Sequence, residues 1–271
     1  MGQAKQRKAA KEAGRPWAPR MPAAVSSATG SSREVRELER LGQLAKIAED
    51  RTRDALQSAR TAADDAGRFD ALRSIPQGAM SLLEAEVAVG YGSSAEMGQL
   101  QQAIACRKGC SFCCHLAVEV TVLEAVAVWR RASASPQLTA AILETASQSA
   151  NVPAMERWRK KVPCPMLGPD GACQVYEDRP GSCRAYVSVD VAACERALVT
   201  AGTDQEDLGV PIIPFPRKIE TAISIGVRRG CAAENLQSSN VELTAALHLL
   251  ATDATAASRW LGGETVFTPY P

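Results

Sequence analysis

The 271-residue chain has few aromatic residues, little histidine and no excess of charge. Aromatic residues make up 4% of it, and histidine occurs only at His115 and His248. Because 31 basic side chains nearly balance 30 acidic ones, the net charge of +1 gives no reason to expect a nucleic-acid-binding or membrane-surface protein. No apolar run approaches the roughly 20 residues that cross a bilayer. P-loop, G-x-G-x-x-G and G-x-S-x-G motifs are also missing, so the common phosphate-binding and hydrolase signatures are excluded.

The start of the chain lacks the apolar segment of a secretory signal. We therefore expect a cytoplasmic protein, in which thiols stay reduced and disulfides are rare. The nine cysteines then need another explanation. Seven of them form two groups, which are Cys106, Cys110, Cys113 and Cys114, and then Cys164, Cys173 and Cys183. Reduced thiols clustered in this way indicate metal ligation, whereas the outlying Cys194 and Cys231 are expected to be buried thiols, unless one of them completes a metal site.

Four segments are predicted along the chain. Residues 1–32 are basic and rich in proline, serine and glycine, so we expect a disordered tail. Residues 33–75 are predicted as one long helix whose alanine-rich seam packs closely against another helix, either within the chain or in a protein partner. Residues 76–235 are expected to form a cysteine-cluster metal-binding domain. Residues 236–271 are expected to form a C-terminal helix and a loose tail.

The expected fold class is mostly α, with a small irregular α+β cysteine-rich subdomain. Thr121 and Glu124 form a capping-box pattern in front of an apolar run, which predicts a helix start. Alternating apolar residues over 115–120 suggest a short strand. The turn at Pro169-Asp170-Gly171 predicts a short β-hairpin around 164–176. Further helices are expected near residues 78–90, 95–105, 136–149, 153–160, 217–228 and 241–261.

The first cysteine group reads Cys106-Arg-Lys-Gly-Cys110-Ser-Phe-Cys113-Cys114. A turn at Gly109 allows several thiolates to face one point, and the basic pair before it favours ionised thiols. Because Cys113 and Cys114 are adjacent, we expect their side chains to point apart, with one of them facing the metal and the other belonging to a second position or to the core. His115 follows directly and is either a ligand or a structural residue.

The second cysteine group begins with Cys164-Pro-Met-Leu and continues with Cys173-Gln-Val-Tyr-Glu-Asp-Arg-Pro-Gly-Ser-Cys183-Arg. Together, the two groups resemble the pattern of the bacterial YkgJ family of cysteine-cluster proteins, which are described as zinc- or iron-chelating domains. The resemblance covers roughly residues 100–190. It implies that the seven clustered cysteines are metal ligands, and it leaves the physiological role open.

The metal and the class of function stay open at this point. Thiolates suit zinc and a [4Fe–4S] cluster equally, and seven thiols exceed the four that either needs. The protein is then a metal-binding module without catalytic residues, or an enzyme that resembles the flagellin lysine-N-methylase group, which is associated with an iron–sulfur cluster and S-adenosylmethionine. Cys106, Cys110 and Cys113 also match radical SAM spacing, but the downstream sequence lacks the alternating strands and helices of such a barrel. Arg179 and Arg184 are expected to brace their loop or to bind an anionic ligand.

Overall fold

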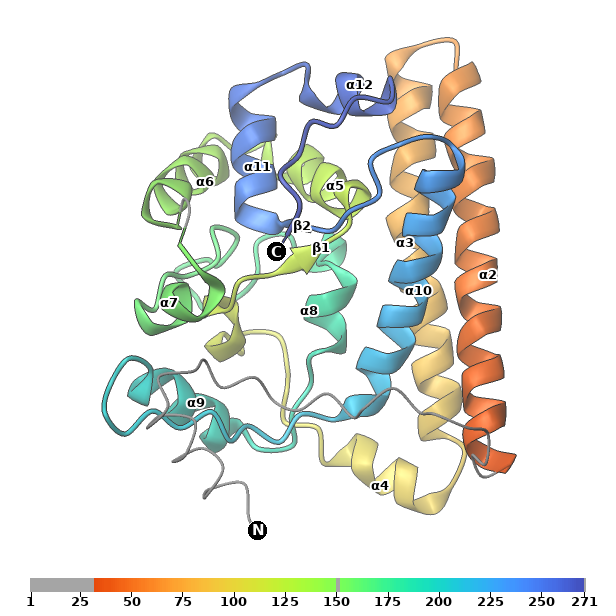
Figure 1. Cartoon of the computed structure of the whole chain (residues 1–271). Helices are drawn as coiled ribbons and strands as arrows, with labels where there is room; N and C mark the ends of the chain where they lie inside the picture. The colour runs from red at the N-terminus through yellow and green to blue at the C-terminus, as the bar shows by residue number, and fades with distance from the viewer. Residues whose placement is uncertain (1–31, 150–151, 271) are drawn as a thin grey trace, which may run out of the picture. The chain divides into compact units, whose positions relative to one another are not determined.

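The computed structural model describes residues 32–149 and 152–270, and this part is mostly helical, as predicted (Figure 1). The expected basic tail lies outside the described residues, apart from Ser32. Contacts within the chain divide it into residues 1–38 and residues 39–271. Of the first unit, the structure describes the opening turns of helix α2; the sections below concern the second unit. In the described residues, no helix is long and apolar enough to cross a membrane.

The helices and strands follow one another in an order that separates the two cysteine groups. Before and around the first group come α2 (Ser32–Thr61), α3 (Asp65–Tyr91), α4 (Ala95–Gln102), the 3-10 helix η1 (Phe112–His115) and strand β1 (Glu119–Val120). Next come α5 (Val122–Ala132), α6 (Pro136–Ser149), α7 (Ala154–Arg159), the 3-10 helix η2 (Tyr176–Asp178) and α8 (Gly181–Ala185). The chain ends with α9 (Val191–Thr200), α10 (Pro214–Ala233), β2 (Val241–Glu242), α11 (Leu243–Thr252) and α12 (Ala256–Leu261).

The prediction of a single helix over residues 33–75 is wrong, because the segment forms two helices, α2 and α3, with an interruption between them. Asp64 adopts an extended conformation there, and its carboxylate accepts the backbone N–H of Gly67 at 2.7 Å. An aspartate in this position satisfies an orphan N–H at a helix start, so it begins a new helix instead of continuing the old one. The helix expected at 78–90 is the second half of α3.

The predicted close packing of the alanine-rich seam is confirmed, and its neighbour is α10. A Cβ atom built on Gly230 would lie 2.6 Å from the Cβ of Thr52 and 2.8 Å from the carbonyl oxygen of Glu49. Gly226, one turn earlier, lies directly against the backbone of Ala45. Two glycines on α10 therefore let its backbone approach α2 closely.

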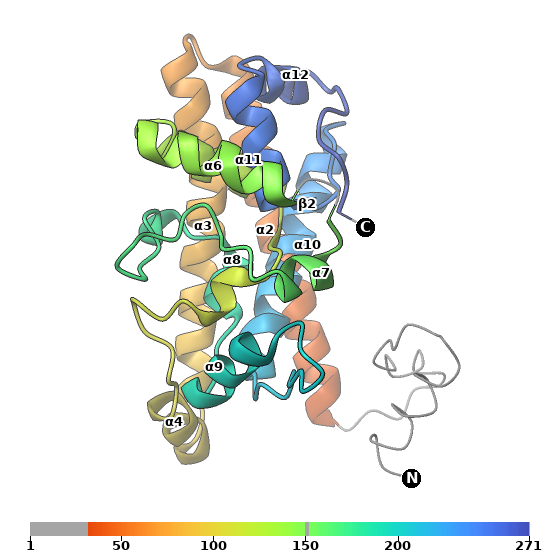
Figure 2. The ribbon, with the colours of Figure 1, turned by 90° about the vertical axis from the view of Figure 1, so that its left-hand side faces the viewer.

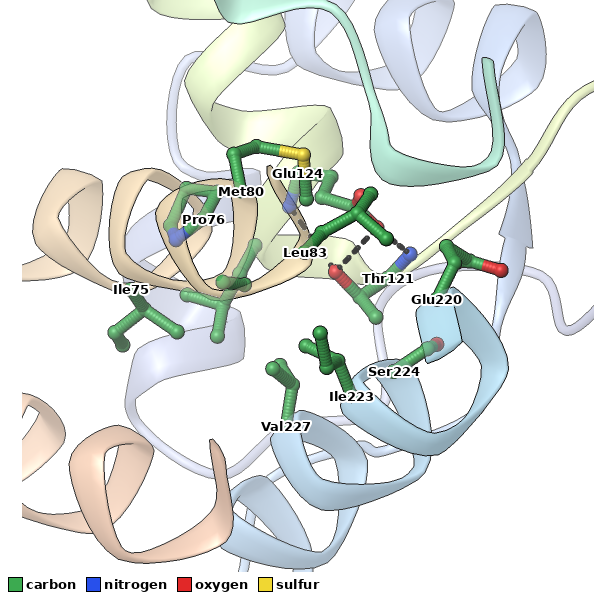
Figure 3. Close-up of a pocket in the computed structure, with 12 residues that line it drawn as sticks. Ile75, Pro76, Met80, Leu83, Thr121, Glu124, Glu220, Ile223, Ser224 and Val227 are labelled. Atoms are coloured by element: carbon green, nitrogen blue, oxygen red, sulfur yellow. Dashed lines mark hydrogen bonds between the residues drawn. The ribbon is translucent and has the colours of Figure 1, made fainter. Parts of the chain in front are cut away.

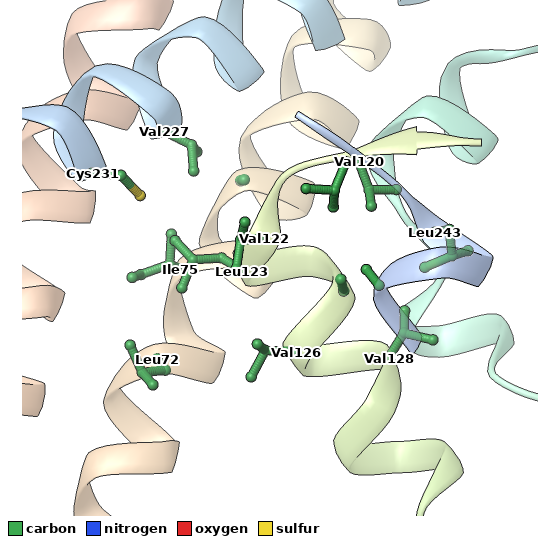
Figure 4. Close-up of a cluster of buried hydrophobic side chains, with 14 of the residues drawn as sticks. Leu72, Ile75, Val120, Val122, Leu123, Val126, Val128, Val227, Cys231 and Leu243 are labelled. Carbon is green, nitrogen blue, oxygen red and sulfur yellow. The ribbon is translucent and has the colours of Figure 1, made fainter. Parts of the chain in front are cut away.

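The main core lies where α3, α5, α10 and α11 meet, and Figure 4 shows part of it. The capping box at the start of α5 forms as predicted: Thr121 Oγ1 accepts the N–H of Glu124, whose carboxylate accepts the N–H of Thr121 at 2.9 Å. This start directs Leu123 and Val126 into the core, where Ile223 of α10 is also buried. The same core draws in residues from Leu44 to Phe267 and so includes both ends of the second unit.

Three predictions for the strands and the C-terminal region need correction. The strand expected at 115–120 is only β1, which pairs antiparallel with β2 through Val120 and Val241. The helix expected at 241–261 is β2 followed by two helices, because Asp253 turns the chain by accepting the N–H of Thr255 at 2.8 Å. Residues 262–270 are packed, since Phe267 is buried and its N–H donates to the Gln237 side chain at 3.0 Å. Helices α8 and α9 were not predicted.

Candidate metal centre

The first cysteine group lies on a loop that leaves α4 and ends in η1. Gly109 has a φ of +90°, which is the left-handed conformation that the turn requires. The N–H of Cys110 donates to the carbonyl of Arg107 at 3.0 Å and closes this turn. Cys113 and Cys114 follow on η1, a tight helix that keeps both residues at the same end of the loop.

The second cysteine group is shaped by the predicted turn. Gly171 has a φ of +75°, and the Asp170 carboxylate accepts the N–H of Ala172 at 3.1 Å. The hairpin expected over 164–176 is a single antiparallel bridge between Leu167 and Cys173. After η2, the short helix α8 carries the last cysteine of the group, Cys183.

A backbone contact joins the two groups. The N–H of Cys164 donates to the carbonyl of Cys114 at 2.7 Å. The two glycine turns also touch, since a Cβ on Gly171 would lie 3.3 Å from the carbonyl oxygen of Gly109. Segments that are distant in sequence are therefore held together by main-chain contacts, which do not depend on the cysteine side chains.

Six of the seven predicted cysteines line one cavity of about 460 Å³. They are Cys110, Cys113, Cys114, Cys164, Cys173 and Cys183. The seventh, Cys106, lies outside this lining, and its Sγ accepts the backbone N–H of Ser188 at 3.3 Å. The expectation that Cys113 and Cys114 point apart is wrong, because both line the cavity and their thiols hydrogen-bond to each other.

The donor set of this cavity suits a soft metal, since its sulfur atoms are the ligands that zinc and iron–sulfur clusters take. In residues 32–149 and 152–270, however, no three cysteine, histidine or acidic side chains converge closely enough to hold a metal ion. The thiols are gathered around one cavity without being aimed at one point. Binding of an ion therefore requires side-chain rotations, for which the cavity provides space.

Among the six cavity thiols, the pKa is raised in five and lowered only in Cys113. Burial raises the pKa of Cys164 to about 11 and raises that of Cys183 well above its usual range. In the adjacent pair, the hydrogen bond from Cys114 stabilises the Cys113 thiolate and lowers the pKa of Cys113 to about 7. The same bond raises the pKa of Cys114. Loss of one proton from the pair is therefore favoured over loss of both.

Arg179 and Arg184 have different roles. Arg184 braces its loop, as predicted, but through main-chain carbonyls: it donates to Glu177 O at 2.6 Å and to Arg179 O at 3.0 Å. Arg179 lies with its guanidinium carbon 4.7 Å from the centre of the Tyr176 ring and lines the cavity. Its positive charge favours the thiolates of three cysteines, Cys113, Cys173 and Cys183.

The remaining cysteines and histidines divide differently than expected. Cys231 is a buried core thiol, as predicted. Cys194 on α9 belongs near the cluster, because the charges of Cys106 and Cys110, together with burial as the larger cause, raise its pKa. His115 lies outside the cavity lining, with its Nδ1 3.3 Å from the carbonyl oxygen of Phe112. His248 is exposed on α11. Cys194 comes near the clustered cysteines only because α9 packs against η1 in the folded chain, and the spacing of the cysteines in the sequence does not indicate this.

The α10 wall of the cavity carries a carboxylate in an unusual environment. Burial, with the nearby Glu124 carboxylate as a smaller cause, raises the pKa of Glu220 to about 7. Figure 3 shows Glu220 and Ser224 on α10, across from the capping pair of α5. The Glu124 oxygens are already occupied, since they accept the N–H groups of Thr121 and Gly181 at 2.9 Å. Glu220 is therefore the carboxyl group of this wall whose pKa is raised toward neutral.

The comparisons with known proteins identify the cysteine-rich region. Residues 105–205 match the model of the family described as "CxxCxxCC: Putative zinc- or iron-chelating domain". This match includes all seven predicted cysteines and also Cys194. No curated protein and no solved structure matches the chain. The resemblance to a zinc- or iron-chelating family is thereby confirmed, while the link to flagellin lysine-N-methylase stays a prediction.

Proposed function

We propose that the chain binds zinc or iron through its cysteine cluster and that this metal stabilises the junction of the two cysteine groups. The observation that carries the proposal is the common cavity onto which six clustered thiols open. The proposed ligands are drawn from the seven cysteines predicted by spacing: Cys106, Cys110, Cys113, Cys114, Cys164, Cys173 and Cys183. Arg179 supports the proposal, because a guanidinium beside several thiolates offsets part of the negative charge that a thiolate-bound metal centre carries.

The thiols fall into two subsets according to which of them are close enough to affect each other's pKa, and we propose that each subset supplies ligands. Cys114, Cys164, Cys173 and Cys183 influence one another through their charges, whereas Cys194 is influenced by Cys106 and Cys110. Cys113 is a neighbour of both subsets. Four thiols in the first subset are enough for one tetrahedral zinc or one cubane cluster. The Cys106 end then supplies further thiols for a second ion.

Anaerobic purification with metal and acid-labile sulfide analysis tests this proposal. Zinc without sulfide in a colourless protein identifies a thiolate zinc site, whereas iron with equal sulfide and absorbance near about 400 nm identifies a cluster. We expect Cys173→Ser to lower the metal content and Cys231→Ala to leave it unchanged, because Cys231 lies in the apolar core. Metal content that is unchanged in Cys110→Ser, Cys173→Ser and Cys183→Ser alike would overturn the proposal.

A second candidate is an iron–sulfur enzyme that modifies a protein with S-adenosylmethionine. The cavity favours it, since about 460 Å³ lies within the usual range of roughly 300–1,000 Å³ for small-molecule sites. A closed structural zinc site does not need such a space. Equilibrium dialysis of S-adenosylmethionine against the anaerobic, iron-loaded chain tests this candidate. The absence of iron, or of cofactor binding to the iron form, contradicts it. A cytoplasmic location and a protein partner for the N-terminal helix stay predictions.

A further inference from the structure

One face of α10 lines the same cavity as the cysteines, and most of its residues there are polar. The residues of this stripe recur at helical spacing: Arg217, Glu220, Thr221, Ser224, Ile225 and Arg228. The opposite face of the helix is apolar and buried in the core through Ile219, Ile223 and Val227. Part of this stripe is exposed to solvent, as is usual for the polar face of an amphipathic helix, whereas Glu220, Ser224 and Arg228 are half-buried against the cavity.

Buried polar atoms that lack a protein partner gather in the same cavity. Within the described residues, the Nε of Arg179, the Oγ of Ser182 and the Oδ1 of Asn240 are buried without a hydrogen-bond partner, and all three residues line the cavity. The amide nitrogen of Asn240 donates to Glu119 at 2.6 Å, which fixes how the free oxygen is directed. Buried polar groups in folded proteins are normally satisfied, so three of them in one place indicate a polar occupant.

The charge of the lining identifies what kind of occupant fits. Four arginines line the cavity, namely Arg107, Arg179, Arg217 and Arg228, against two carboxylates, Glu119 and Glu220. In the described part of the chain, none of these arginines forms an ion pair, although Arg217 lies 5.8 Å from the centre of the Tyr186 ring, and the Glu119 carboxylate is engaged by Asn240. Arg228 is held by its Nε, which donates to Ser238 O at 2.8 Å. That contact leaves the terminal nitrogens of Arg228 available, and guanidinium groups bind carboxylates and phosphates in a two-pronged manner.

We propose that the cavity binds a small oxyanion-bearing molecule, with its carboxylate or phosphate group on Arg228 of α10 and its remainder extending toward the cysteines. Arg217 lies three helical turns before Arg228, about 16 Å along the helix, so it does not share this group. Arg179 lies beside the thiols and lines the same cavity. The site goes beyond metal binding, because its anchoring residue is on α10, outside both cysteine groups.

Titration calorimetry of the full reduced chain with two probes, inorganic phosphate and succinate, tests the site. We expect saturable 1:1 binding of at least one probe, and the stronger probe distinguishes a phosphate from a carboxylate ligand. Arg228→Gln is expected to weaken it about tenfold or more, the usual effect of losing a charged hydrogen bond. Arg229→Gln is the matched control, because this exposed neighbour of Arg228 lies outside the cavity lining.

The measurement is made on the metal-loaded and on the metal-free chain, with metal content determined for each sample. Binding that depends on Arg228 but not on Arg229 in both forms supports the site, whether or not the metal proposal holds. Equal weakening in Arg229→Gln shows only diffuse attraction to positive charge and overturns the proposal. The proposal is also overturned if neither probe binds with a Kd below about 1 mM, which corresponds to a binding free energy of roughly −4 kcal/mol. Loss of metal in Cys173→Ser with unchanged anion binding would separate the two functions.

Discussion

The backbone N–H of Cys164 donates a hydrogen bond of 2.7 Å to the carbonyl oxygen of Cys114. This bond holds the start of the second cysteine group against the end of the first, so thiols from both groups open onto one cavity. In the unfolded chain nothing keeps these segments together. A metal that binds thiols from both groups therefore binds the folded state preferentially and stabilises it.

We expect metal removal by a chelator to lower the melting temperature by about 5–10 °C, which corresponds to a ligand present at roughly a hundredfold excess over its Kd. Hydrogen exchange should increase mainly over residues 100–190, because both cysteine groups lie in this segment. In Cys173→Ser the chelator-dependent shift should shrink, while in Cys231→Ala it should persist. An unchanged melting temperature after complete metal removal would contradict a stabilising metal centre.

The Glu220 carboxyl predicts a pH dependence of stability. Its pKa is raised from 4.5 to about 7 in the folded protein, mainly by burial, with Glu124 and Glu119 adding to the effect and Arg217 opposing it. The folded state then binds more protons than the unfolded state, so stability falls as the pH rises from about 4.5 to about 7. The loss amounts to about 3 kcal/mol at most.

Urea unfolding of Glu220→Gln and of the wild type across this pH range measures the effect. The two proteins should be similar in stability near pH 4.5, and the variant should be more stable above about pH 7 by up to about 3 kcal/mol. Glu144→Gln, on the exposed face of α6, serves as the control and should follow the wild type at every pH. A difference between Glu220→Gln and wild type that stays constant with pH would contradict the assignment.

Local chemistry made part of the fold predictable. The capping box of Thr121 and Glu124 and the turn at Gly171 depend on residues within a few positions of each other, and both occur as expected. The break at Asp64 also has a local signal, an aspartate followed three residues later by glycine, but the helical periodicity on both sides concealed it. The packing of the C-terminal tail depends on Gln237, which is distant in sequence from Phe267, so no local pattern indicates it.

Part of the candidate site was also predictable from the sequence, and part was not. Cysteine spacing identified the six thiols that line the cavity, because the ligands of a metal site recur in short motifs. It gave the wrong orientation for Cys113 and Cys114, since it did not anticipate the 3-10 helix that carries both. The polar stripe of α10 could be read as a solvent-exposed helix face. Only the folded chain brings Arg228 and Glu220 to the same cavity as the cysteines.

The close packing of α10 on α2 predicts that adding a single methyl group at Gly230 strongly lowers the stability of the protein. Gly230→Ala places a Cβ 2.6 Å from Thr52, which is closer than such atoms approach, and should destabilise the protein by about 3 kcal/mol. Gly42→Ala is the control, because no atom lies within 4 Å of its added Cβ and alanine favours a helix by about 1 kcal/mol. Chemical unfolding should therefore show opposite signs for the two variants. Equal effects would mean that the helices are not packed in this way.

A buried arginine connects α7 to the start of α11. The Arg157 side chain is 3% exposed, and its guanidinium donates to Glu242 at 2.8 Å and to Thr244 at 2.9 Å. Arg157→Met leaves both acceptors without their donor, and removing one partner of a buried pair typically costs about 3–5 kcal/mol. Chemical unfolding measures this loss.

The double variant Arg157→Met with Glu242→Gln should recover part of the loss, since it also removes the uncompensated charge. Its recovery is limited, because Glu242 also caps α11 by accepting the N–H of Ala245 at 2.8 Å. Arg159→Met provides the comparison from the same helix: its pair with Glu206 is half in solvent, and exposed pairs contribute little. If Arg159→Met destabilised the protein as much as Arg157→Met, burial would not be the reason for the effect.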